Sequence, residues 1–503
     1  MSVQERLRAL SGGALQGMRR GIEKESLRVR PDGSLAQTPH PAALGSALMH
    51  PHITTDFSES QLELITGVHA SVEDCLEELT QIHQVVYKAI GEEILWCASM
   101  PCNLPADHLI PIGRYGTSNV GRAKTVYRLG LAHRYGRRMQ AISGIHYNFS
   151  LPGVTDEQYF ALIRNFRRES WLVLYLFGAS PAVCSSFVAG REHELTELAP
   201  ATHYAPHATS LRMGRLGYQS DAQASLCVSY NDLEHYTASL YEALTQSYPA
   251  YEKIGIRDGD DYRQLNTTLL QIENEFYSSI RPKRRIKRGE RPLHALRERG
   301  VEYVEVRLMD LDPFSPIGIT PATCRFLDIF LLRCLLADSP PDTPREINEV
   351  RRNLQKVAVR GREPGLALER NGDRAPLADW AREVLAQCEP IPQALDRRFG
   401  GAAYRDAYEA ALKLLADAGE TPSARVLHAM ARNHDNAFVR FALIESTLHK
   451  STLQHLELPK PVRERFSRLA QESMLKQREL EAADEIDFET FRQRYLAHDL
   501  LRV

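Results

Sequence analysis

The sequence predicts an α+β protein in which strands with one polar face are followed by a mostly helical region. Several short segments alternate apolar and polar residues with a period of two, which is the pattern of a strand with one buried face. After residue 316 the pattern changes to helical periodicity. At 503 residues the chain also exceeds one ordinary hydrophobic core. We therefore expect a first unit at residues 1–318 and a helical second unit at residues 319–503, packed on the first.

Charge is balanced over the chain, because 62 lysines and arginines accompany 64 aspartates and glutamates. The formal net charge of −2 provides no global field that would attract nucleic acid or an anionic membrane. Residues 171–190 contain no charged residue over 20 positions, the length of a membrane span. Gly178, Ser180 and Pro181 interrupt this run, so we expect a buried helix end, a turn and a buried strand instead.

The eight cysteines show no CxxC pair and no zinc-like spacing with histidines. This usage is typical of reduced, mostly buried thiols in a cytoplasmic protein. Residues 1–10 include Glu5, Arg6 and Arg8 and lack the apolar core of a signal peptide. A cytoplasmic location is the expectation.

Two acids lie two residues apart in the predicted strand at residues 21–29. Alternate side chains of a strand point the same way, so Glu23 and Glu25 would stand roughly 7 Å apart on one face. Paired carboxylates suit hard divalent cations such as Mg²⁺. The alternative is a solvated strand edge, because Lys24 and Arg28 lie nearby and alternating charges usually face water.

A third acid, Glu63, points away from the apolar side chains of a predicted strand at residues 60–66. Residues 71–91 then predict an amphipathic helix with Ser71 as its N-cap. We assign this helix to the scaffold.

Residues 113–124 are rich in glycine, hydroxyl groups and cations, a composition that could cradle phosphate. The segment matches no Walker or dinucleotide fingerprint, and loops of this composition are more often plain turns. Alone, this motif is weak evidence for a nucleotide site.

The segment at residues 143–151 alternates sharply, with His146 and Asn148 on its polar face. A lone histidine is more often a satisfied core residue than a ligand, but a polar face beside strands that carry acids favours a cavity. A helix should follow, because Thr155 and Gln158 are spaced as a capping box.

Two later segments also have a period of two. Residues 270–277 predict a strand that leads into the basic cluster at residues 281–285, which is either an anion site or, more often, a solvated loop. Residues 303–308 predict a strand that places Glu305 and Arg307 on one face.

The helical region opens with Thr320-Pro321 and Thr343-Pro344, which each place an N-cap residue before a proline at the first helical position. The turn pair Asn371-Gly372 separates elements within this region. Further helical periodicity occurs at residues 377–387, 404–418, 423–433, 438–449 and 461–483.

Taken together, six motifs resemble those of the bacterial glutamate–cysteine ligases. The match runs from residue 21 to residue 484, nearly the whole chain, and several motifs are too long to arise by chance. They are Gly21-Ile22-Glu23-Lys24-Glu25, Thr54-Thr55-Asp56-Phe57, Tyr115-Gly116-Thr117-Ser118-Asn119, Gly144-Ile145-His146-Tyr147-Asn148-Phe149-Ser150, Gln271-Ile272-Glu273-Asn274-Glu275 and Asp312-Pro313-Phe314-Ser315-Pro316-Ile317-Gly318. The resemblance implies a glutamine-synthetase-like fold, in which a curved, mainly antiparallel sheet forms an active-site funnel with flanking helices.

The resemblance also implies roles for individual residues, with no departure at the acid positions. The implied metal ligands are Glu23, Glu25, Asp56, Glu63, His146 and Glu305. Arg212 and Arg307 match the arginines that hold the glutamate substrate, and with Glu305 they are the implied catalytic residues. The implied acceptor pocket consists of Tyr127, Leu131, Ile142, Tyr218 and Tyr277. Arg281 and Lys283 fall where contacts with the ATP phosphates are expected.

The implied reaction joins the γ-carboxylate of L-glutamate to the amine of L-cysteine through a γ-glutamyl phosphate, the first step of glutathione biosynthesis. ATP is the co-substrate, Mg²⁺ or Mn²⁺ the cofactor, and no obligatory protein partner is implied. One rival is a ligase of the same superfold that uses another amine; another is an amino-acid or nucleotide sensor, which the complete set of metal positions disfavours. A bifunctional glutathione-forming enzyme is disfavoured, because fewer than 190 residues follow Ser315.

Overall fold

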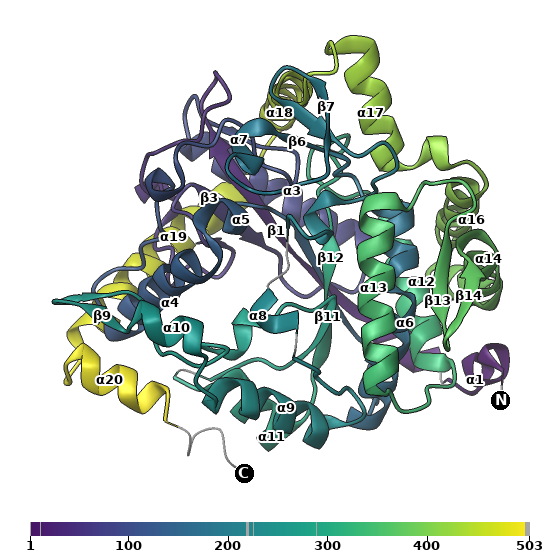
Figure 1. Ribbon diagram of the computed structural model, residues 1–503, viewed down its shortest axis with the longest axis horizontal. Coiled ribbons are helices and arrows are strands. Elements are labelled where there is room, and N and C mark those ends of the chain that lie inside the picture. The colour runs from purple at the N-terminus through teal and green to yellow at the C-terminus, as the bar shows by residue number, and fades with distance from the viewer. Residues whose placement is uncertain (1, 11, 218–220, 225, 288, 498–503) are drawn as a thin grey trace.

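The computed structural model describes residues 2–10, 12–217, 221–224, 226–287 and 289–497 (Figure 1). Its centre is a seven-stranded antiparallel sheet in the order β11-β12-β5-β1-β3-β2, with β4 paired to the far end of β1. The strands are β1 (Arg19–Val29), β2 (Ile53–Thr55), β3 (Gln61–Ile65), β4 (Ile94–Leu95), β5 (Ile145–Ser150), β11 (Ile280–Lys283) and β12 (Tyr303–Met309).

Strands form at the segments 21–29, 60–66, 143–151 and 303–308, as the alternation predicted. Because alternate side chains point to opposite faces, each strand divides its residues between two environments. The apolar members, among them Ile22, Leu64 and Tyr147, belong to the main hydrophobic core. Glu23, Glu25, Glu63, His146 and Glu305 lie on the other face.

Three helices contribute many residues to this core: α3 (Val72–Ala89), α6 (Asp156–Phe177) and α12 (Pro321–Leu336). Local capping sets where they begin. The Ser71 hydroxyl accepts a hydrogen bond from the Asp74 N–H, and Thr155 with Gln158 forms the predicted capping box. The helix starts read from the sequence are therefore confirmed.

The predicted strand at residues 270–277 is wrong. The segment instead contains a 3-10 helix, η4 (Glu273–Glu275). The Gln271 N–H donates to Glu275 Oε2 at 2.6 Å, and Arg134 pairs with the same carboxylate at 2.9 Å. Such local side-chain bonds compete with a strand ladder, so the alternation of polar residues here reflects ion pairing.

The charge-free run at residues 171–190 is a helix end, a turn and a short buried strand, as predicted. Helix α6 ends at Phe177, and β6 (Ala182–Cys184) joins a small sheet in the order β6-β8-β7. Its other strands are β7 (Thr196–Ala199) and β8 (Thr202–Tyr204). Within the described part of the chain, no helix has both the length and the apolar character needed to cross a membrane.

The region after residue 318 is mostly helical, as predicted, but it also contains a hairpin of β13 (Ala367–Arg370) and β14 (Asp373–Pro376) that turns at Asn371-Gly372. Helices α12 and α16 from this region share the main core with the sheet. The boundary between residues 318 and 319 stays a prediction. The further helices are α13 (Pro344–Arg360), α14 (Leu377–Cys388), α15 (Pro390–Phe399), α16 (Ala403–Ala416), α17 (Pro422–Asn433), α18 (Phe438–His455), α19 (Lys460–Ala482) and α20 (Phe488–Tyr495).

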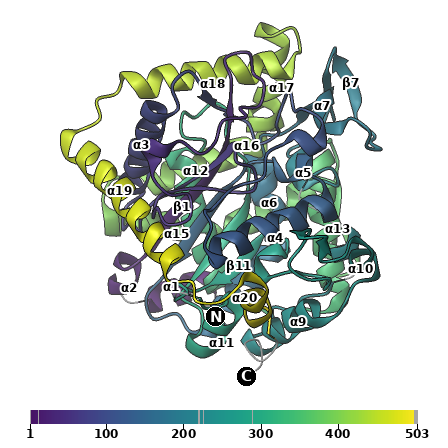
Figure 2. The same cartoon turned by 90° about the vertical axis from the view of Figure 1, so that its left-hand side faces the viewer.

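Helices α19 and α20 lie on the side of the molecule opposite α14 and α16 (Figure 1). Figure 2 shows α19 running along that side toward α20. The remaining elements are α1 (Val3–Ala9), α2 (Gly12–Gln16), α4 (Asn119–Tyr135), α5 (Arg137–Gln140), α7 (Ser185–Val188), α8 (Asp221–Ala224), α9 (Leu233–Thr245), α10 (Pro249–Ile254), α11 (Pro292–Arg299), β9 (Arg257–Asp258) and β10 (Asp261–Tyr262).

Candidate active site

Polar side chains from neighbouring strands gather on one face of the main sheet because of the strand register. Glu23 of β1 lies opposite His146 of β5, and Glu25 lies opposite Glu63 of β3. Glu305 belongs to β12, the strand beyond β5. Cross-strand neighbours have Cβ atoms about 5 Å apart, so these charged groups interact directly.

Glu23, His146 and Glu305 form the tightest group, in which one ligand atom of each lies within 4.8 Å of the others. His146 Nδ1 is 3.2 Å from Glu23 Oε2 and 3.8 Å from Glu305 Oε1. The Asn148 amide donates to Glu23 Oε1 at 2.9 Å. Burial and the nearby Arg307 charge lower the pKa of His146, which favours the neutral imidazole that metals require.

Glu305 is fully buried, and two cations keep it charged. Arg307 Nη1 donates to its Oε2 at 2.8 Å, and Lys283 Nζ lies 3.2 Å from its Oε1. Burial opposes ionisation, yet these cations hold the pKa of Glu305 well below its usual range. Burial also opposes ionisation of Glu23, but its contact with His146 lowers the pKa of Glu23 overall.

A second acidic group adjoins the first and consists of Glu25, Asp56 and Glu63. The Gly144 N–H donates to Glu25 Oε2 at 2.7 Å. Burial, with the Asp56 charge as the next cause, raises the pKa of Glu25 to about 8. Burial and Asp56 also raise the pKa of the half-buried Glu63. Burial and repulsion between these acids thus outweigh the attraction of the nearby cations, which are Arg212 and Arg307 at Glu25 and Lys124 at Glu63.

This donor set fits a hard divalent cation, because carboxylates and an imidazole are ligands that Mg²⁺ and Mn²⁺ accept. Glu305 Oε1 is buried and faces the Lys283 ammonium at 3.2 Å, so a metal ion bound at this oxygen would take the place of that lysine contact. The structure brings Glu23, His146 and Glu305 within mutual ligand distance, and Glu25, Asp56 and Glu63 lie in the adjoining group. Their roles as ligands stay predictions.

The two arginines predicted to hold glutamate lie at different depths. Arg307 of β12 has a side chain 18% exposed, and its guanidinium faces Glu305. Arg212, in the 3-10 helix η3 (Leu211–Met213), is 1% exposed and donates to the Arg307 carbonyl at 3.0 Å. Arg307 is thus the more accessible of the two, and Arg212 supports its backbone.

Sequence reasoning missed two residues that hold Arg212 in place. Asp310 Oδ1 lies 3.8 Å from Arg212 Nη1, and the carboxylate accepts hydrogen bonds from Ala179 N–H and Ser210 Oγ. Gly144 leaves room for the guanidinium, because a Cβ there would lie 2.1 Å from Arg212 Nη2. A glycine next to a strand is a usable signal of such close approach, whereas nothing local distinguishes Asp310.

The predicted acceptor pocket is partly assembled. Tyr127 and Leu131 lie one turn apart on α4. Tyr127 is close enough to Tyr277 for that residue to contribute, after burial and Glu275, to the raised pKa of Tyr127. The Gln140 amide donates to the Tyr277 hydroxyl at 2.8 Å.

Ile142 is fully buried in a second apolar cluster, against which Tyr277 also packs. Tyr218 lies outside the described residues. The acceptor role of all five positions stays a prediction.

The basic cluster at residues 281–285 divides between site and solvent. Arg281 is buried and donates to the Phe276 carbonyl, while Lys283 pairs with Glu305. Arg285 has a side chain 81% exposed. Only the first part of the cluster can therefore reach a ligand on the sheet face.

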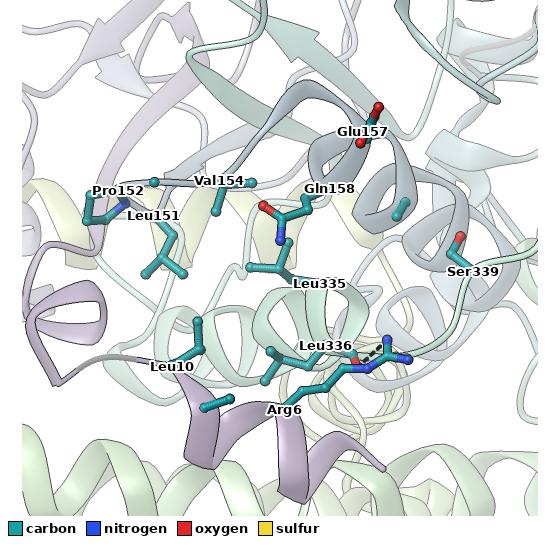
Figure 3. Close-up of a pocket in the computed structure, with 14 residues that line it drawn as sticks. Arg6, Leu10, Leu151, Pro152, Val154, Glu157, Gln158, Leu335, Leu336 and Ser339 are labelled. Atoms are coloured by element: carbon teal, nitrogen blue, oxygen red, sulfur yellow. Dashed lines mark hydrogen bonds between the residues drawn. The ribbon is translucent and has the colours of Figure 1, made fainter. Parts of the chain in front are cut away.

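A cavity of about 480 Å³ lies between α1, the start of α6 and the end of α12 (Figure 3). Its lining is mostly apolar, and the Arg6 guanidinium donates to the Leu336 carbonyl at its edge. None of the predicted site residues lines it. The candidate active site is therefore the polar face of the sheet.

An antiparallel sheet with acids, an imidazole and arginines on one face fits the class that the resemblance implied, a ligase of glutamine-synthetase-like fold. The sequence profile of the glutamate–cysteine ligase family matches residues 6–357. A glutamate–cysteine ligase of Alcanivorax borkumensis is 46% identical over 524 aligned positions, covering 99% of each chain. One of Pseudomonas putida is 49% identical over 495 positions, covering 95% of this chain and 94% of its own.

A solved structure agrees with these relatives. The glutamate–cysteine ligase of Francisella tularensis, crystallised in complex with AMP, has a TM-score of 0.91 and 37% identity. The match covers 96% of this chain and 98% of that one. The chain belongs to the glutamate–cysteine ligase family, and the predicted fold class is confirmed.

Proposed function

We propose that this chain joins the γ-carboxylate of L-glutamate to the amine of L-cysteine at the expense of ATP, which is the first step of glutathione biosynthesis. The observation that carries the proposal is the buried group of Glu23, His146 and Glu305 beside Arg307 and Lys283. In a chain of this family, these side chains and a metal ion that they could hold would reduce the repulsion between a substrate carboxylate and the phosphates of ATP.

The chemistry needs no nucleophilic side chain. A γ-carboxylate oxygen of glutamate attacks the γ-phosphorus of ATP, and ADP leaves. The cysteine nitrogen then attacks the acyl carbon of the γ-glutamyl phosphate, phosphate leaves, and the amine loses a proton. The main obstacle is repulsion between a carboxylate and a polyphosphate, so the protein's contribution is electrostatic.

Each side chain has a distinct part in this scheme. Arg307 offers the planar fork that pairs with the substrate carboxylate, and Glu305 orients that fork. Lys283 and Arg281 lie on the edge strand, where they can meet ATP phosphates. Mg²⁺ or Mn²⁺, when held by the two acidic groups, would neutralise phosphate charge.

The acceptor is expected to be recognised by shape and aromatic contact. Tyr127, Leu131 and Tyr277 carry no formal charge at pH 7, and sulfur–aromatic contacts contribute about 0.3 to 1.5 kcal/mol each. A pocket without a dedicated partner for the thiol cannot strongly reject a methyl group, so 2-aminobutyrate should be accepted and serine should be poor. The ratio of kcat/KM for cysteine to that for serine should fall in Tyr127→Ala; an unchanged ratio would place the pocket elsewhere.

The decisive experiment measures ADP formation from ATP and glutamate across a panel of amine acceptors, with product masses. We expect turnover with cysteine and formation of γ-glutamylcysteine. Higher kcat/KM with an unrelated amine would make the protein a different ligase. Binding of ATP and glutamate by calorimetry without ADP formation would make it a sensor.

We infer a cytoplasmic location and no nucleic-acid partner. All eight cysteines are free and only Cys227 among them is exposed, which supports a reducing compartment. The balanced charge of the chain supports small-molecule substrates.

A further inference from the structure

The loop at residues 111–118, which contains much of the glycine-rich motif, runs beside the segment that carries Asp56. Gly113 N–H donates to the Phe57 carbonyl at 2.9 Å, and Ser58 Oγ donates to the Pro111 carbonyl at 2.8 Å. The loop thus contacts the connection from β2 to β3 along its length. These bonds show that the motif serves contacts within the protein.

Tyr115 makes the central contact. Its ring is 1% exposed, and its hydroxyl lies 2.6 Å from both the Thr55 and the Asp56 carbonyl oxygens. Gly113 is required beside it, because a Cβ there would lie 2.9 Å from the Tyr115 hydroxyl. A buried hydroxyl directed at two backbone carbonyls fixes the orientation of the peptide that carries Asp56.

Arg128 of α4 completes the contact from the other side. Its Nε also donates to the Asp56 carbonyl, and its guanidinium stacks over the Tyr115 ring at 4.4 Å from the centroid. The Asp56 N–H donates to the Gln61 carbonyl at 3.0 Å. Both sides of this residue's backbone are therefore held, although Asp56 lies outside the strands.

The end of α19 holds the loop from behind. Glu481 Oε1 accepts a hydrogen bond from the Thr117 N–H at 2.8 Å, and Asp484 Oδ2 accepts one from the Asn119 N–H at 2.6 Å. Gly116, at φ 81°, lets the two segments meet, because a Cβ there would lie 2.3 Å from Glu481 Oε1. The helical region thus reaches the active site through this loop.

We propose that Tyr115, together with Arg128, is a positioning residue that fixes Asp56 in the orientation needed to bind the divalent cation. The three carboxylates repel one another, so an unbraced Asp56 would turn away from Glu25 and Glu63 before metal arrives. Outer contacts that orient a ligand typically change metal affinity by 10- to 100-fold. This inference rests on the proposed metal site.

The test measures Mn²⁺ binding to the full-length protein by electron paramagnetic resonance, without nucleotide or amino acids. We expect Tyr115→Phe to raise the Mn²⁺ Kd about 10-fold or more and to raise the Mg²⁺ concentration needed for half-maximal turnover in parallel. Asp56→Asn should raise the Kd at least as much. The matched control is Tyr408→Phe, because Tyr408 is also buried and donates to a backbone carbonyl, that of Leu385, at 3.0 Å.

An unchanged Kd in Tyr115→Phe, with a weakened Asp56→Asn, would overturn the positioning role alone. An unchanged Kd in Asp56→Asn would overturn it together with the metal assignment. An equal loss in Tyr408→Phe would reduce Tyr115 to a packing residue and likewise overturn the proposal. If Tyr115→Phe does not fold, Arg128→Lys removes the Nε donor while keeping the charge, and the same rise in Kd is expected.

Discussion

The two faces of the main sheet both carry buried charges, but they arrange those charges differently. On the core face, Arg20 of β1 pairs with Asp328 of α12 at 3.0 Å. The hydroxyls of Tyr147 and Tyr404 donate to the same carboxylate at 2.7 and 3.1 Å. On the polar face, the carboxylates of Glu25, Asp56 and Glu63 act on one another, and burial with the Asp56 charge raises the pKa of Glu25 to about 8.

This difference separates a group that serves the fold from one that serves a ligand. On the core face, the Asp328 carboxylate meets Arg20 and two tyrosine hydroxyls within the protein. On the polar face, burial and repulsion between neighbouring carboxylates keep the pKa values of Glu25 and Glu63 raised, and an added cation would relieve that repulsion. Residues on opposite faces of one strand thus differ in role: Arg20 of β1 serves the fold, and Glu23 of β1 serves the ligand site.

The largest expected effect is on the polar face. Glu305→Gln and Glu23→Gln should each lower kcat/KM by about three orders of magnitude, because each removes charge that would hold a cation between phosphates. Both variants should stay folded, but the melting temperature should fall, because the lowered pKa values of Glu305 and Glu23 mean that their charged forms stabilise the folded state. Glu302→Gln, at an acid paired with exposed Arg285, is the control. Near-normal activity of both site variants at saturating Mg²⁺ would refute the metal assignment.

The second expected effect is on the core face, where a substitution should reduce stability and leave the kinetics of the folded enzyme nearly unchanged. Asp328→Asn leaves the buried Arg20 without its counter-charge and should cost about 3 to 5 kcal/mol in the free energy of unfolding. Urea denaturation measures this loss. The KM values of the folded enzyme should change little, because the pair lies behind the sheet. A rise in the glutamate KM without loss of stability would show that the two faces are not independent.

The sequence predicted which acids, histidine and arginine share one face of the sheet, because the alternation of side chains in β1, β3, β5 and β12 is a local property of each strand. It failed at residues 270–277, where alternating polar residues mark ion pairs with Arg134 and Arg291 from distant segments. Asp310 and the Tyr115 contact with Asp56 were missed for the same reason. Their meaning depends on which distant segments meet, and no local pattern encodes that.

A third prediction concerns Arg307 and tests whether this residue of the polar face binds glutamate or ATP. Arg307→Lys should raise the glutamate KM by about 10- to 100-fold with a smaller effect on the ATP KM, because a lysine cannot form the planar two-donor contact with a carboxylate. Steady-state kinetics with each substrate varied in turn measure both constants. Arg285→Lys at an exposed arginine is the matched control. Collapse of ATP affinity with an unchanged glutamate KM would assign Arg307 to the nucleotide.

The smallest expected effect is on the stability of the metal-free protein as a function of pH. The pKa of Glu25 rises from its ordinary 4.5 to about 8 on folding, because of burial first and Asp56 next. A raised pKa means that the folded state holds the proton more tightly. The resulting stability is fully present below about pH 4.5 and is lost as the pH rises through about 8.

Between about pH 6 and pH 9 the Glu25 contribution should therefore lower the melting temperature without divalent cations, while Lys24 and Lys124, whose pKa values burial lowers to about 7 and about 8, act in the opposite direction. Protons and cations compete for the same carboxylates, so Mg²⁺ should raise the melting temperature more at the higher pH. Relative to wild type, Glu25→Gln should lose the Glu25 part of this dependence and keep the part due to Glu63 and the two lysines. Scanning calorimetry of both proteins with a chelator, and then with Mg²⁺, measures each slope. An identical slope in wild type and variant would mean that Glu25 is already balanced by its neighbours, and the contrast between the two faces would then rest on Glu63 alone.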